Sequence, residues 1–109
     1  MAWLLRDGEV LAAVEVASSR GDRLRGALGR DHLEGALLLR PARSVHTVGL
    51  RFAIDVAFCD RELVVVTTRR MVRHRVGLPR WRAHSVIEAE AGAFERWRLR
   101  PGDHLELRM

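Results

Sequence analysis

The sequence predicts a mainly β fold of the β-rich α+β kind: a compact, mainly antiparallel sheet, curled into a barrel or sandwich, with two short helices. Short apolar runs are separated by frequent turn signals, of which Asp7-Gly8 and Pro101-Gly102 are examples. Most neighbouring runs lack the helical crossover of a dozen or more residues that parallel strands need. With 109 residues the chain has room for one hydrophobic core, so we expect a single domain over residues 1–109.

The first two strands are expected to form a hairpin. The apolar-rich runs Ala2–Arg6 and Glu9–Ala17 flank Asp7-Gly8, a dipeptide that tolerates positive φ at both centres of a two-residue turn. The other strands are expected at Gly35–Arg40, Ser44–Val48, Ala53–Cys59, Glu62–Thr68, His84–Ala89 and His104–Met109.

Two short helices complete the expected elements. Ser18 or Ser19 can cap the first helix by accepting hydrogen bonds from its free amides, and Gly29 is expected to end it. The second helix is expected over Ala91–Arg98, with aromatic residues three apart that would dock on the sheet.

The positive charge is concentrated in one stretch of the chain. All 19 basic residues are arginines, and six of them lie between Leu63 and Ile87, where no acidic residue occurs. The other 13 arginines face 14 acidic residues, so the rest of the chain is nearly neutral. We expect residues 69–83 to form a long loop that carries this charge.

This loop provides the leading functional hypothesis, a non-enzymatic accessory or binding module that presents arginines to an unknown acidic partner, protein or nucleic acid. One alternative is an RNA or other polyanion binder, because guanidinium groups neutralise phosphates and an exposed tryptophan can stack on a base. A plainer interpretation is a loop that is charged only because it is solvated. The candidate binding residues are Arg69, Arg70, Arg73, Arg75, Arg80, Trp81 and Arg82.

Asp55 places a carboxylate inside an otherwise apolar strand pattern, which is costly unless partners hold it. One hypothesis is a small hydrolase-like enzyme in which Asp55 works with His46, since a histidine oriented by an aspartate is half of a catalytic triad. The favoured interpretation is structural: Asp55 would accept hydrogen bonds from the backbone amides of residues 49–52, or pair with Arg30 or Arg51. The substrate of the enzymatic alternative is unknown.

No cofactor, metal ion or membrane span is expected. The five histidines are scattered without metal-ligand spacing, no nucleotide-binding glycine motif occurs, and no apolar run approaches about 18 residues. The first residues lack the pattern of a secretory signal, and the single Cys59 is expected to be a small core residue. We therefore expect a cytoplasmic protein.

Further residues are expected to support the fold at turns, caps and ion pairs. At least one arginine beside the first helix is expected to pair with a carboxylate such as Asp55 or Glu88. Structural capping before the second helix is expected of both Glu88 and Glu90, of which Glu90 lies near the helix start. The full set of expected structural residues is Arg23, Gly26, Arg30, Gly35, Asp55, Glu88, Gly92, Gly102 and Asp103.

Several blocks of the chain, in the same order, resemble domain-of-unknown-function family 192. The blocks are residues 23–30, 35–38, 46–60, 86–92 and 99–103. The chain departs from the family pattern at Leu50, where a methionine is usual, at Ala53, where a proline is usual, and at Gly26-Ala27-Leu28, where Gly-Leu-Met is usual. The resemblance implies a small β-rich domain, found in bacteria and archaea, whose biochemical role is not established.

Overall fold

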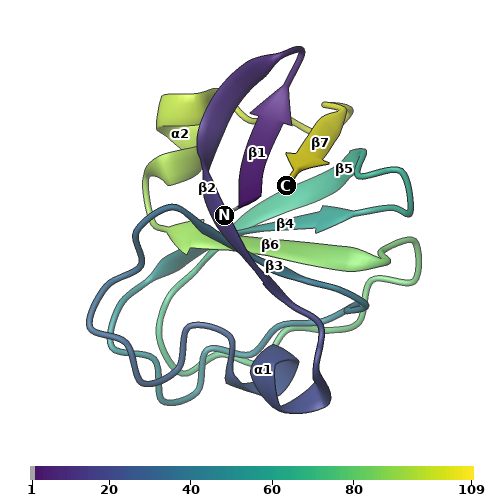
Figure 1. The fold of residues 1–109 in the computed structure, drawn as a ribbon. Helices are drawn as coiled ribbons and strands as arrows, with labels where there is room; N and C mark the ends of the chain where they lie inside the picture. The colour runs from purple at the N-terminus through teal and green to yellow at the C-terminus, as the bar shows by residue number, and fades with distance from the viewer. Residues whose placement is uncertain (1) are drawn as a thin grey trace.

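The computed structural model describes residues 2–109, and within them the chain forms seven strands and two short helices (Figure 1). In chain order these are β1 (Ala2–Arg6), β2 (Glu9–Ala17), α1 (Arg20–Arg25), β3 (Ala36–Leu39), β4 (Ile54–Cys59), β5 (Val65–Met71), β6 (Ser85–Glu90), α2 (Ala93–Trp97) and β7 (Leu105–Arg108).

The strands form one curled sheet in the order β5-β4-β6-β3-β2-β1-β7. Every pairing is antiparallel except that of β2 with β3. The sheet curls far enough for a backbone bridge to join Val64, just before β5, to His104, just before β7. The predicted fold class is therefore confirmed, in the form of a half-barrel.

The N-terminal hairpin matches its prediction at both strands and at the turn. Asp7 and Gly8 have φ values of 52° and 81°, the left-handed backbone that a two-residue hairpin turn requires. Because β2 is longer than β1, its last three residues continue beyond the hairpin, and together with Val14 they pair with β3. One long strand thus joins the two halves of the sheet (Figure 1).

Both faces of the central strands are buried, as β4 shows. Ile54, Val56 and Phe58 belong to one hydrophobic cluster, whereas Ala57 and Cys59 belong to another. The second cluster also contains Phe94 of α2. The alternation predicted for this strand is correct, and it serves two apolar surfaces because side chains in a strand point alternately to opposite faces.

The first helix begins where the sequence predicts and ends earlier. Ser19 caps α1 by accepting a hydrogen bond of 3.1 Å from the amide of Asp22. The helix ends at Gly26, which has a φ of 49° and donates its amide to Asp22, so the expected end at Gly29 is wrong. Gly26 stops the helix first because it takes up a backbone conformation that glycine adopts without strain.

Two other boundaries differ from the sequence prediction. The expected strand at Ser44–Val48 is wrong, because in this segment only His46 forms a β-bridge, with Val76. The expected loop over residues 69–83 starts too early, since β5 extends to Met71 and carries Arg69 and Arg70 on a strand. Arginine has little strand preference of its own, and pairing with β4 determines the conformation here.

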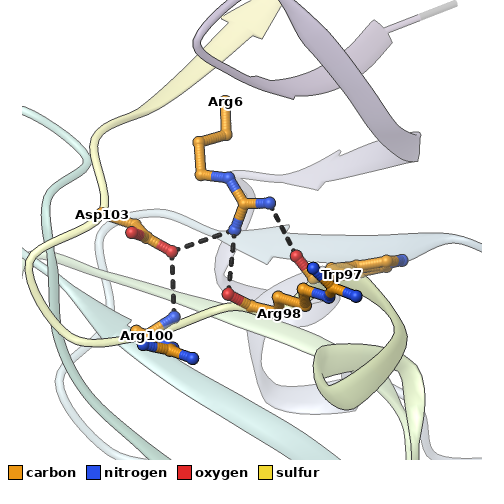
Figure 2. Close-up of polar contacts among 5 residues, drawn as sticks. All are labelled: Arg6, Trp97, Arg98, Arg100 and Asp103. Atoms are coloured by element: carbon orange, nitrogen blue, oxygen red, sulfur yellow. Dashed lines mark hydrogen bonds and ion pairs between the residues drawn. The ribbon is translucent and has the colours of Figure 1, made fainter.

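Side chains from the sheet hold α2 in place, and Figure 2 shows the contacts at its C-terminal end. Arg6 of β1 donates to the carbonyl oxygens of Trp97 (2.7 Å) and Arg98 (3.1 Å) and to the carboxylate of Asp103 (3.0 Å). Asp103 also accepts from the amide of Arg100 at 2.9 Å. A cation therefore satisfies free carbonyl groups at the negative end of the helix.

We expect Gly35→Ala to destabilise the fold much more than Gly102→Ala. Both glycines have positive φ, 68° and 95°, so each alanine would carry a similar backbone penalty of about 1–2 kcal/mol. A Cβ at Gly35 would also lie 2.4 Å from the carbonyl oxygen of Ala13, whereas Gly102 has open space. Urea unfolding should show the difference, and equal losses of stability would contradict the close approach of β2 at Gly35.

Candidate functional site

The arginine-rich segment forms one wall of an open groove of about 600 Å³ beside β5. We call this the arginine groove. Its lining residues are Phe58, Arg69, Arg70, Met71, Val72, Arg75, Val76, Gly77, Leu78, Pro79 and Arg80. Four of the seven predicted binding residues therefore line one surface, and they share it with apolar side chains.

A neighbouring stretch of chain holds the groove wall in place. The amide of Thr47 donates to Arg75 O at 2.7 Å, and the amide of His74 donates to Thr47 O at 2.8 Å. The amide of Gly77 donates to Val45 O at 2.8 Å. The buried Thr47 hydroxyl donates to Val72 O at 2.6 Å and accepts from the amide of Arg75 at 2.8 Å. These hydrogen bonds therefore hold the predicted loop against residues 43–50.

The arginines of this segment have few acidic partners. Among residues 2–109, Arg70 is the one member of the set from Arg69 to Arg82 that forms an ion pair. The guanidinium of Arg80 lies 5.5 Å from the centre of the Phe58 ring. Trp81 is 78% exposed, and like Arg73 and Arg82 it lies outside the groove lining. Most of the positive charge therefore faces solvent.

The carboxylate of Asp55 is almost completely buried and fully partnered. One oxygen accepts from Arg70 Nε at 3.0 Å, and the other accepts from the amides of Gly92 (2.9 Å) and Phe94 (3.2 Å). The predicted partners were wrong, because Arg30 pairs with Glu15 and Arg51 with Asp31. A buried anion held by three donors supports the structural interpretation.

His46 does not meet Asp55, since no contact of the Asp55 carboxylate involves it. His46 lies instead at the wall of a smaller cavity, together with Arg23, Gly26 and Glu88. The geometry gives no support to an enzyme built on Asp55 and His46. The structure does bring four sequence-predicted residues together, at a place where the sequence predicted no site.

Glu88 is the residue whose environment sequence reasoning missed. Its side chain is 3% exposed, and its Oε1 atom has no hydrogen-bond partner among the described residues. Burial raises the pKa of Glu88 to about 7, and the nearby amide of Ala27 and guanidinium of Arg30 oppose this rise only in part. Glu88 lies within β6, two residues before its end, so the expected role at the start of α2 is wrong. The signal in the sequence was a carboxylate inside an apolar strand pattern, as at Asp55.

The remaining predicted residues have local roles in the contacts of the fold. Arg23 donates to the carbonyl of Ser18, and Gly92 precedes α2 in a left-handed conformation with a φ of 100°. Burial raises the pKa of the Cys59 thiol to about 12, so the thiolate is not formed near neutral pH. No group of three or more potential metal ligands occurs within residues 2–109. The two described helices are far too short to cross a membrane.

The sequence model of DUF192, a family described as "Uncharacterized ACR", matches residues 2–107, which is nearly the whole chain. The chain belongs to the DUF192 family. No curated protein sequence matches the chain.

Two crystal structures are similar in fold to this DUF192 chain. One is a protein of unknown function from Novosphingobium aromaticivorans, with 17% identity and a TM-score of 0.80, covering 96% of this chain and 82% of that one. The other is described as a "putative transcription regulator" from Sinorhizobium meliloti, with 20% identity and a TM-score of 0.81, covering 96% and 90%. At these identities the similarity establishes the fold.

We expect Asp55→Ala to lower the free energy of unfolding by about 3–5 kcal/mol, because it leaves two buried amides without their acceptor and removes the charge paired with Arg70. Arg70→Ala is the matched control. The Arg70 side chain is 54% exposed, and the Gly92 and Phe94 amides still hold Asp55 without it, so its loss should destabilise the fold less than the loss of Asp55. Urea unfolding of both variants checks this, and a fully stable Asp55→Ala protein would contradict the structural interpretation.

We expect the contribution of Glu88 to the free energy of unfolding to fall as the pH rises from 4.5 to about 7, because in that range the folded chain keeps a proton on Glu88 that the unfolded chain releases. Glu88→Gln removes this group. The stability difference between wild type and Glu88→Gln should therefore shift by roughly 2–3 kcal/mol between pH 4 and pH 8, in favour of the variant at pH 8. Glu90→Gln, an exposed change on the same strand, is the control for urea unfolding at both pH values. A constant difference between wild type and Glu88→Gln would contradict the buried carboxyl.

Proposed function

We propose that this DUF192 chain is a binding module that holds an acidic segment of another protein in the arginine groove. The observation that carries the proposal is that five of the six arginines from Arg69 to Arg82 have no carboxylate partner within residues 2–109. Clustered like charges repel one another, so an uncompensated cluster on a fixed surface favours an anionic partner.

The rigidity of the groove wall supports a binding role. Backbone hydrogen bonds and the Thr47 side chain fix the segment on residues 43–50, so its arginines are displayed on an ordered backbone. A preorganised surface loses less conformational entropy on binding than a free loop. This property also distinguishes the segment from a merely solvated loop.

The apolar part of the groove favours a protein partner over a nucleic acid. Val72, Val76 and Leu78 are exposed apolar residues of the same lining, and apolar side chains of a peptide can pack on them. The groove also runs beside β5, which forms one edge of the sheet. An extended peptide can add to such an edge through backbone hydrogen bonds, a mode that nucleic acids lack.

A nucleic acid is the competing partner. One structural neighbour is described as a "putative transcription regulator", and Arg82 with the exposed Trp81 offers a cation beside a stacking surface. These residues lie outside the groove lining, whereas Arg69 and Arg75 lie inside it. Comparing probes of the two kinds with the same protein therefore separates the alternatives.

We expect a fluorescent peptide of alternating glutamate and leucine to bind the wild-type protein in anisotropy titrations, and to bind less tightly as salt is raised from 0.05 to about 0.5 M, because salt screens exposed charges. Arg69→Ala combined with Arg75→Ala should weaken binding about tenfold, since each exposed ion pair contributes up to about 1 kcal/mol. Arg20→Ala combined with Arg61→Ala removes the same charge from exposed positions elsewhere and should have little effect.

A single-stranded oligonucleotide of equal charge is the second probe in this experiment. Tighter binding of the oligonucleotide, lost on Trp81→Ala, would replace the protein partner with a nucleic acid. Equal weakening of peptide binding by the groove and control variants would contradict a specific role of the groove.

A further inference from the structure

A second, more enclosed space lies between the end of α1 and the sheet. This cavity of about 210 Å³ shares Val76 and Gly77 with the arginine groove as a common wall, but none of the arginines that line the groove. At about 30 Å³ for each water-sized group, it has room for roughly seven such groups, the size of a small metabolite. We call it the Glu88 cavity.

The carboxyl group of Glu88 forms part of the cavity wall, and one of its two oxygens lacks a hydrogen-bond partner. Glu88 is 3% exposed, and its Oε1 atom accepts no hydrogen bond from any described residue. Buried carboxyl oxygens are nearly always paired in folded proteins, because leaving them unpaired is costly. The only other buried carboxylate, Asp55, has three donors within the described residues. The missing partner of Glu88 therefore points to a ligand that donates a hydrogen bond.

Gly26 brings the backbone close to this carboxyl group and adds no side chain to the cavity. A Cβ at Gly26 would lie 3.0 Å from Glu88 Oε1, and the φ of Gly26 is positive. Any other residue would crowd the carboxyl group and narrow the space beside it. The end of α1 thus forms a wall of backbone over Glu88.

The rest of the lining indicates what else the ligand carries. Leu39 and Leu50 are buried apolar residues of the wall, suited to a compact aliphatic group. Arg25 and His46 are exposed residues of the same lining, and the arginine can bind a carboxylate at the mouth. The ligand would therefore carry a hydrogen-bond donor beside Glu88, an aliphatic group beside the leucines and an acidic group beside Arg25. A small aliphatic amino acid has all three.

We propose that the Glu88 cavity binds a small aliphatic molecule that has an amine and a carboxylate, of which valine is the simplest probe. The amine donates to the Glu88 carboxyl group, the aliphatic group packs on the leucines, and the carboxylate faces Arg25. The site is separate from the proposed arginine groove and does not depend on it.

Titration calorimetry of the intact protein with three probes tests this site. Valine should bind, whereas isovalerate, which lacks the amine, and isobutylamine, which lacks the carboxylate, should each bind at least tenfold more weakly. At pH 8, where the Glu88 carboxyl group is ionised, Glu88→Gln should weaken valine binding at least tenfold, because the buried carboxylate is the ionic partner of the amine. Glu90→Gln, the exposed change on the same strand, should leave valine binding unchanged.

Circular dichroism on Glu88→Gln verifies that the variant is folded, and backbone NMR shifts of Gly26 and Ala27 on adding valine locate the ligand. The absence of binding by all three probes at 10 mM, or equal valine affinity in wild type and Glu88→Gln, would overturn the proposal. The variant with Arg69→Ala and Arg75→Ala should bind valine normally. The experiment therefore distinguishes two failures: that of the arginine groove to bind a peptide and that of the Glu88 cavity to bind an amino acid.

Discussion

The buried carboxylate of Asp55 is the contact on which the arrangement of this molecule depends. It lies on β4, next to the edge strand β5, and accepts hydrogen bonds from the amides of Gly92 and Phe94 at the start of α2 and from Arg70 of β5. A helix of five residues is too short to be stable alone, so α2 depends on contacts at its ends. Asp55 supplies an anion at its positive end, and Arg6 supplies a cation at its negative end. With both ends held, α2 brings Phe94 onto one face of the sheet and completes that core.

The same contact affects the charge of the arginine groove, because Arg70 is one of its lining residues. Because Asp55 neutralises Arg70, the charge that remains for a partner comes from the other arginines of the groove. Thr47 and the backbone of residues 43–50 fix the wall that carries several of them. The wall includes Val76 and Gly77, which also border the Glu88 cavity. The arginine groove and the Glu88 cavity therefore share one ordered piece of backbone. The groove is lined by arginines, whereas the cavity contains a buried carboxyl group.

Local patterns in the sequence predicted the parts of the fold that local physics determines. The Asp7-Gly8 turn, the Ser19 cap and the alternation of β4 each depend on residues within a few positions, and all three are confirmed. The partners of Asp55 lie 15, 37 and 39 residues away, so spacing along the chain could not identify them. Residues 44–48 have the composition of a strand, but most of their backbone hydrogen bonds go to the irregular segment of residues 74–77. The burial of Glu88 likewise depends on the backbone at Gly26, just after α1, lying close to its carboxyl group, a contact made only in the folded chain.

Native-state hydrogen exchange at the amides of Gly92 and Phe94 tests most directly whether Asp55 holds α2 on the sheet. Amides at the start of an isolated helix have no intrahelical acceptor and exchange quickly, so any strong protection at these two positions must come from Asp55. We expect both amides to exchange only by global unfolding, at the free energy measured for Val56 in the centre of β4. Exchange of Gly92 and Phe94 at rates close to those of an unfolded peptide, while Val56 stays protected, would contradict the central role of this carboxylate.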